Sequence, residues 1–99
     1  MNAPTLFDKT VQQKFFEFHE ANPHVYNLLV RFAREVKARG KNRTSIALLF
    51  NRARWEVQFS TTDPEFKIRN DFMPHYARMI MACNDDLDGL FETRRIWKP

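Results

Sequence analysis

Several residue types and patterns are scarce in this chain of 99 residues, and each scarcity excludes a class of protein. The single cysteine, Cys83, cannot form an internal disulfide, so we expect a reducing, cytoplasmic environment. The two glycines, Gly40 and Gly89, are too far apart to form a glycine-rich phosphate loop. No long uncharged apolar run exists, so the sequence predicts no membrane span. The first ten residues, MNAPTLFDKT, lack the charged and apolar regions of a signal peptide.

Metal-ligand patterns are also scarce. The three histidines, His19, His24 and His75, form no ligand pair at zinc spacing, either with each other or with the cysteine. The stretch AsnAspAspLeuAspGly, residues 84–89, resembles the start of a calcium loop. Its twelfth position, however, is Arg95, where the loop requires a bidentate glutamate. We therefore expect an acidic turn here, and neither a metal nor a cofactor.

Catalytic patterns are no stronger. Glu65 and Lys67 form a Glu-x-Lys pair of the kind found in metal-dependent nucleases, but Asp63 is too close in sequence to lie on a partner strand. That leaves Glu56 as the other nearby acid, and the chain looks too helical for such a site. Cys83 lies on an apolar helix face and is predicted to belong to the core, not to act as a nucleophile. The sequence therefore favours a protein that is not an enzyme.

What the chain has in quantity is aromatic and apolar residues. Hydrophobic residues make up 43 % of the chain, and ten are phenylalanines. This content is sufficient for one core without disulfides or metals. We predict one mainly helical domain over residues 1–99, in which residues 1–6 form a flexible tether.

Apolar periodicity and capping residues predict four helices. The first runs from about Asp8 to Ala21, with Asp8 or Thr10 as its cap. The second starts at Asn22 as N-cap, with a proline in its first turn, and ends at Gly40 in a left-handed conformation. The third begins after Thr44 or Ser45 and continues to about residue 58. The fourth follows a cap at residue 70 or 71 and runs to about residue 84, before the acidic turn.

The stretch over residues 55–69 has two interpretations. Apolar residues alternate over 55–59 and again over 66–68, which would suit a hairpin of Trp55–Phe59 against Glu65–Arg69. We favour a helix through residue 58, because the 3.6-residue period is unbroken from Ile46 to Val57. Residues 66–68 would then be extended and pair with residues 94–97. The predicted fold class is all-α or mainly α, a compact four-helix domain with, as a variant, a small two-stranded element of winged-helix type.

The periodic apolar positions predict the core. Its members come from all four helices and from the segment after the acidic turn: Phe15, Phe18, Leu28, Phe32, Val36, Ile46, Leu49, Phe50, Ala53, Ile80 and Phe91.

Positive charge is concentrated in one part of the chain. Residues 31–54 hold eight Lys or Arg and one acid, a local charge of +7, whereas the remaining eight bases and eleven acids give −3. This basic helical hairpin suits a nucleic-acid partner, DNA in the first place. The alternative explanation is a face that only solubilises the protein. The predicted binding residues are Arg31, Arg34, Lys37, Arg39, Lys41, Asn42, Arg43, Thr44, Arg52 and Arg54.

The hairpin meets the helix-turn-helix template only in part. With Gly40 as the turn glycine, Ile46 and Leu49 fall on the template's apolar positions, but Glu35 and Lys41 stand where apolar residues are usual. The start of the third helix is predicted to add backbone N–H groups for phosphate binding. The prediction therefore depends on charge and not on a recognised motif.

A second functional class is a small modulator that binds a host or phage protein and has no nucleic-acid role. Exposed aromatic residues would favour it, and the candidates are Tyr26, Trp55, Phe72 and Trp97, although most of these are expected in the core. A homodimer is a further possibility, because a domain of this size can bury some of its aromatic residues between two copies.

Five short motifs resemble those of a family of small uncharacterised proteins from phages and prophages. They are AsnProHisValTyr, ArgTrpGlu, PheLys-x-x-Asn, TyrAlaArg-x-Ile-Met and GlyLeuPheGluThrArg. The resemblance covers about Phe15 to Arg95 and carries no catalytic residue. It implies an accessory or regulatory role related to a phage, such as DNA handling or modulation of a host protein.

Overall fold

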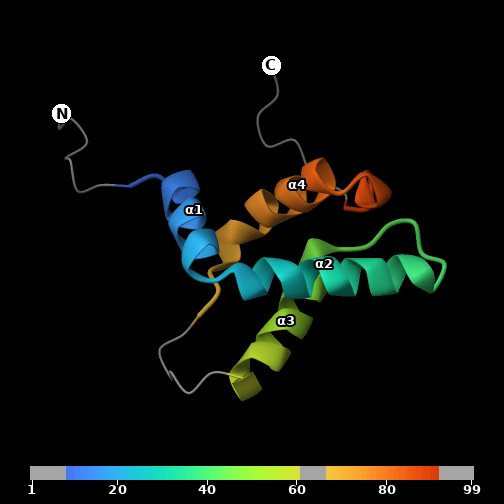
Figure 1. Ribbon diagram of the computed structural model, residues 1–99, viewed down its shortest axis with the longest axis horizontal. Helices are drawn as coiled ribbons and strands as arrows, with labels where there is room; N and C mark the ends of the chain where they lie inside the picture. Colours follow the sequence, from blue (N-terminus) through green and yellow to red (C-terminus); the bar gives the residue numbers. More distant parts are fainter. Residues whose placement is uncertain (1–8, 61–66, 92–99) are drawn as a thin grey trace.

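The computed structural model describes residues 9–60 and 67–91, and these residues form a mainly α-helical domain. Its α-helices are α1 (Val11–Ala21), α2 (Pro23–Ala38), α3 (Ile46–Ser60) and α4 (Met73–Cys83). Two short 3₁₀ helices, η1 (Asn70–Phe72) and η2 (Asp85–Leu87), flank α4. Figure 1 shows α4 on one side of α2, while α3 leads away on the other side. The predicted four-helix fold class is confirmed.

The junction of α1 and α2 depends on Thr10 and Asn22. Thr10 caps α1 in a reciprocal arrangement, because its hydroxyl accepts from the Gln13 amide (3.1 Å) and the Gln13 side chain accepts from the Thr10 amide (2.9 Å). The other candidate cap, Asp8, lies outside the described residues. Asn22 makes no side-chain cap to α2; its amide and side chain both donate to the Phe18 carbonyl and so close α1. Asn22 thus stands at the predicted N-cap position of α2 and is also the C-cap of α1, and its side chain hydrogen-bonds to α1.

The turn between α2 and α3 follows its sequence signals closely. Gly40 has a φ of +94°, a left-handed conformation that suits glycine and ends α2 as predicted. Ser45, and not Thr44, caps α3 through its hydroxyl, which accepts from the Ala47 amide at 3.1 Å. The Thr44 amide donates instead to the Leu90 carbonyl (2.9 Å), so the turn is held to the segment that follows η2.

Residues 55–59 are helical in α3, so the alternative hairpin is wrong for its first strand. The helix extends two residues beyond the predicted end at residue 58. Of the predicted two-stranded element, Phe66 and residues 94–97 lie outside the described residues. In the described part of the chain no strand forms; a single parallel bridge joins Thr44 to Phe91.

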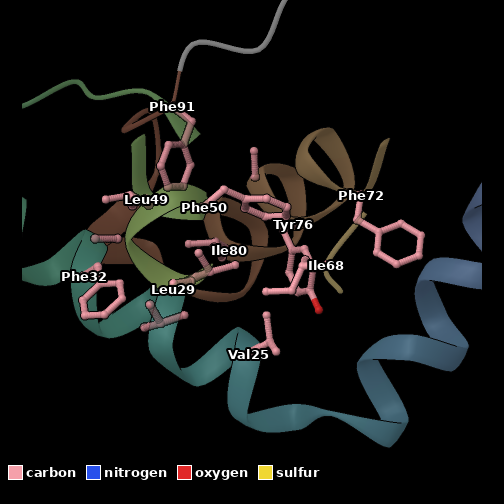
Figure 2. Packing of buried hydrophobic residues seen from close by; sticks show 14 of the residues in the cluster. Val25, Leu29, Phe32, Leu49, Phe50, Ile68, Phe72, Tyr76, Ile80 and Phe91 are labelled. Carbon is pink, nitrogen blue, oxygen red and sulfur yellow. The ribbon is translucent and has the colours of Figure 1, made fainter. Parts of the chain in front are cut away.

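The core lies where α2, α3 and α4 meet (Figure 2). Seven of the eleven predicted core residues are buried: Phe15 on α1, and Phe32, Leu49, Phe50, Ala53, Ile80 and Phe91. The other four pack against its edge with partial exposure: Phe18, Leu28, Val36 and Ile46. On α2, Leu29 is fully buried in place of the predicted Leu28, because the buried face of this helix is centred on Val25, Leu29 and Phe32.

The C-terminal end of α4 differs from the sequence prediction. Cys83, predicted as a core residue, is exposed at the last position of the helix. The chain leaves the helix at Asn84, and the following turn η2 carries Leu87 into the core, where it is fully buried. Leu87 thus supplies the apolar side chain that Cys83 was expected to supply.

Candidate nucleic-acid interface

The ten predicted binding residues do not form one uniform surface. They extend from the middle of α2, through the turn, into α3. The acidic turn at η2 and the segment 67–70 engage two of the arginines. The side chains therefore fall into three overlapping groups: bases held by distant parts of the chain, arginines gathered around one glutamate, and bases at the end of the hairpin.

Arg34 belongs to the first group. Its guanidinium donates to both carboxylate oxygens of Asp86, at 3.0 and 3.3 Å, and to the Asn84 side-chain oxygen at 3.0 Å. This hydrogen bonding lowers the pKa of the Asp86 carboxyl and raises the pKa of Arg34. The Lys37 ammonium donates to the Asp86 backbone carbonyl. Arg34 and Lys37 thus attach the turn at η2 to α2.

Arg54 also turns inward. Its guanidinium donates to the Ile68 carbonyl (2.6 Å) and to the Asn70 side chain, and it lies 5.4 Å from the Phe50 ring centre. These contacts join α3 to the segment that enters η1. Arg54 therefore has a structural role that the sequence pattern did not reveal, because its partners are 14 and 16 residues away.

Three arginines gather around Glu35 on the side of α2 that meets α3. Arg52 of α3 forms an ion pair with Glu35 at 3.1 Å, and Arg39 approaches the same carboxylate at 3.6 Å. The guanidinium carbons of Arg52 and Arg31 lie 4.1 and 5.2 Å from the Phe32 ring centre. The hydrogen bond from Arg52 lowers the pKa of Glu35, with Arg39 and Arg31 adding to the effect. One carboxylate among three guanidinium groups leaves a local excess of positive charge.

The end of the hairpin carries the third group. We call Lys37, Arg39, Lys41 and Arg43 the basic tip; all four side chains are exposed, and no acid occurs between residues 36 and 55. Asn42 is exposed beside them. Thr44 is half-buried and its amide is bonded to Leu90, so its backbone holds the tip in place.

The start of α3 offers fewer backbone donors than expected. The amides of Ala47, Leu48 and Leu49 already donate to Ser45, through its hydroxyl or its carbonyl. The predicted contribution of this helix start to phosphate binding is therefore reduced by the chain's own cap.

Sequence reasoning named Trp55 as a candidate interface aromatic but missed the two exposed apolar residues beside it, Leu48 and Phe59. Leu48, Trp55 and Phe59 project from α3 with 60, 60 and 70 % of their surface exposed, and the Trp55 and Phe59 rings meet edge-to-face at 5.2 Å. The available signal was their spacing, because positions i, i+7 and i+11 share one side of a helix. Of the other candidate interface aromatics, Phe72 is buried, Tyr26 is half-buried and Trp97 lies outside the described residues.

Within residues 9–60 and 67–91, no group of three or more His, Cys, Asp or Glu side chains is placed to hold a metal ion. No helix in these ranges is long and apolar enough to span a membrane. Comparisons of the chain with family models, curated proteins and solved structures find no match.

Proposed function

We propose that this protein binds nucleic acid, DNA in the first place, through the basic tip, as a non-enzymatic accessory or regulatory protein of phage or prophage type acting in the cytoplasm. One observation carries the proposal: four exposed bases within seven residues, with no acid on either side until Glu35 and Glu56. Phosphate groups are the partners that such a cluster binds most generally, because each contact releases condensed counterions.

The contacts that these side chains make within the protein indicate which of them belong to the proposed interface. Lys41 and Arg43 in the turn, with Lys37 and Arg39 beside them, form the centre of the proposed interface. Arg31 and Arg52 extend it along the cluster around Glu35. Arg54 faces segment 67–70, so it supports the fold and does not bind phosphate in this proposal.

The test is a titration with duplex and single-stranded DNA over a series of salt concentrations. Binding should weaken linearly in a log–log plot, and Lys41→Ala/Arg43→Ala should reduce the slope by about 1.8, or about 0.9 for each lost phosphate contact. The matched control is Lys14→Ala/Arg78→Ala, which removes the same charge from exposed positions of α1 and α4. An equal loss in the control, or no binding at about 50 mM salt, would contradict the proposal.

The exposed apolar residues of α3 favour the second candidate, a protein-binding role. The two functions are compatible, because the basic tip and the exposed side of α3 are different surfaces.

A further inference from the structure

Helix α3 has two apolar faces. One packs into the core through Leu49, Phe50, Ala53 and Val57. The other, which we call the α3 stripe, consists of Leu48, Arg52, Trp55 and Phe59. At 100° per residue, these four positions fall within about 60° of each other, roughly opposite the core face. Figure 1 shows that the C-terminal half of α3 lies apart from α1, α2 and α4.

The apolar part of this stripe is formed by three exposed side chains, Leu48, Trp55 and Phe59. Fully exposed aromatic side chains present about 150–250 Å² each, so Trp55 and Phe59, with 60 and 70 % of their surface exposed, present about 250 Å² together. With Leu48 the patch approaches about 350 Å², the size of the largest apolar patch on a typical monomer, and such patches are often functional.

We propose that the α3 stripe binds the same stripe of a second copy of this chain, with the two helices antiparallel. The spacing supports this partner, because the intervals from Leu48 to Phe59 are four, three and four residues and so are identical in either direction. A two-fold axis between positions 53 and 54 places Leu48 of one copy against Phe59 of the other. The same axis places Arg52 against Trp55, and each contact occurs twice.

The charges of α3 agree with this pairing. The Arg52 guanidinium lies 4.1 Å from the Phe32 ring centre and pairs with Glu35, yet 45 % of its side chain is exposed. In the proposed pair this exposed part meets Trp55 of the second copy in a cation–π contact. In an antiparallel pair, each flank of a helix meets the same flank of its partner. Glu56 lies on the Arg52 flank, so each glutamate approaches an arginine of the other copy. The opposite flank carries the uncharged Asn51 and Gln58.

The antiparallel arrangement also separates the two basic tips. Each tip precedes the N-terminal end of its own α3, and the 15 residues of this helix span about 22 Å. The tips therefore lie at opposite ends of the helix pair, whereas a parallel pair would bring the two clusters of positive charge together. The α3 stripe shares only Arg52 with the proposed nucleic-acid interface, and this inference does not depend on that function.

The size of the stripe sets the expected strength. Two stripes bury about 700 Å² of apolar surface, and their polar borders bring the total to about 1,000–1,200 Å², the lower end for specific interfaces. We expect a dimer that dissociates on dilution. Sedimentation of the full chain over a concentration series should show a monomer–dimer equilibrium, and Trp55→Ala should raise its dissociation constant about tenfold or more.

The matched control is Phe16→Ala, which removes an aromatic side chain from α1 that is 46 % exposed. This variant should leave the dissociation constant unchanged, and circular dichroism should confirm that both variants remain helical. A wild-type chain that stays monomeric at several hundred micromolar would overturn the proposal. A dimer whose dissociation constant does not rise in Trp55→Ala would also overturn it. So would a monomeric protein in which Trp55 contacts a nucleic acid or a different protein.

A pair of double variants tests the register. Positions 51 and 58 are exposed and should face each other across the two-fold axis. Asn51→Lys/Gln58→Glu should tighten the dimer at low salt, because it creates two opposite-charge contacts between the copies. Asn51→Lys/Gln58→Lys should loosen it through like charges. If both variants change the dissociation constant in the same direction, or neither changes it, the antiparallel register is wrong.

Discussion

The Arg34 guanidinium donates to both carboxylate oxygens of Asp86, although 52 residues separate the two in the chain. This clasp joins the middle of α2 to the turn after α4. It also places a carboxylate against the proposed nucleic-acid interface. Asp86 therefore bears both on the stability of the fold and on the charge available to a ligand.

The first prediction concerns pH. Arg34 lowers the pKa of Asp86 below its ordinary value of 3.8, so the unfolded chain takes up the proton first as the pH falls. The contribution of the Arg34–Asp86 ion pair to folding stability is therefore present at pH values above 3.8. It is lost as the pH falls through the lower pKa that Asp86 has in the folded state. Urea unfolding should give a higher midpoint for wild type than for Asp86→Asn at pH 7, and the difference should close in acid. A difference that does not change with pH would contradict this linkage.

The second prediction concerns binding. Asp86→Asn removes the carboxylate charge that pairs with Arg34 and lies near Lys37, so DNA affinity should rise severalfold at low salt. The matched control is Asp71→Asn, because Asp71 pairs with Arg69 at 2.6 Å beside η1. The control makes the same change in net charge away from the hairpin. Equal gains in both variants would show that net charge, and not the clasp, determines affinity.

The third prediction separates Arg54 from the binding residues. Arg54→Ala removes the donor to the Ile68 carbonyl, so the free energy of unfolding should fall by about 1–3 kcal/mol, as measured by urea denaturation. The salt slope of DNA binding should remain that of wild type. Lys41→Ala should show the reverse pattern, an unchanged stability with a shallower slope. A shallower slope for Arg54→Ala would place this side chain at the interface after all.

Much of the fold could be predicted because its signals are local. Pro23 and Gly40 mark the bounds of α2 through their own backbone preferences, and the 3.6-residue period of α3 excluded the hairpin. The clasp could not be predicted, because a charge run does not show which arginine meets a distant carboxylate. The prediction that Cys83 belongs to the core is wrong for a related reason. The path of the chain after α4 decides which side chain is buried there, and that turn brings Leu87 into the core.

The fourth prediction concerns Tyr76, which is fully buried against Phe15 and Phe50. Its hydroxyl has no hydrogen-bond partner among the described residues, and burial raises the pKa of this phenol. Tyr76→Phe should therefore leave the free energy of unfolding unchanged or raise it by about 1 kcal/mol, because it removes a buried polar atom that the fold does not satisfy. Urea denaturation gives the value. A clear loss of stability would show that the hydroxyl has a partner in the folded protein.

The fifth prediction joins the two proposals. A dimer with a basic tip at each end can bind a long duplex at two points, so its second contact forms at a high effective concentration. Trp55→Ala should then weaken binding to a duplex of about 30 base pairs at protein concentrations where wild type is dimeric. A loop-closed duplex of about six base pairs spans about 20 Å, too short for both tips, and should bind wild type and variant equally. If the variant loses affinity for both duplexes, Trp55 contacts the nucleic acid directly, and the two surfaces are not separate.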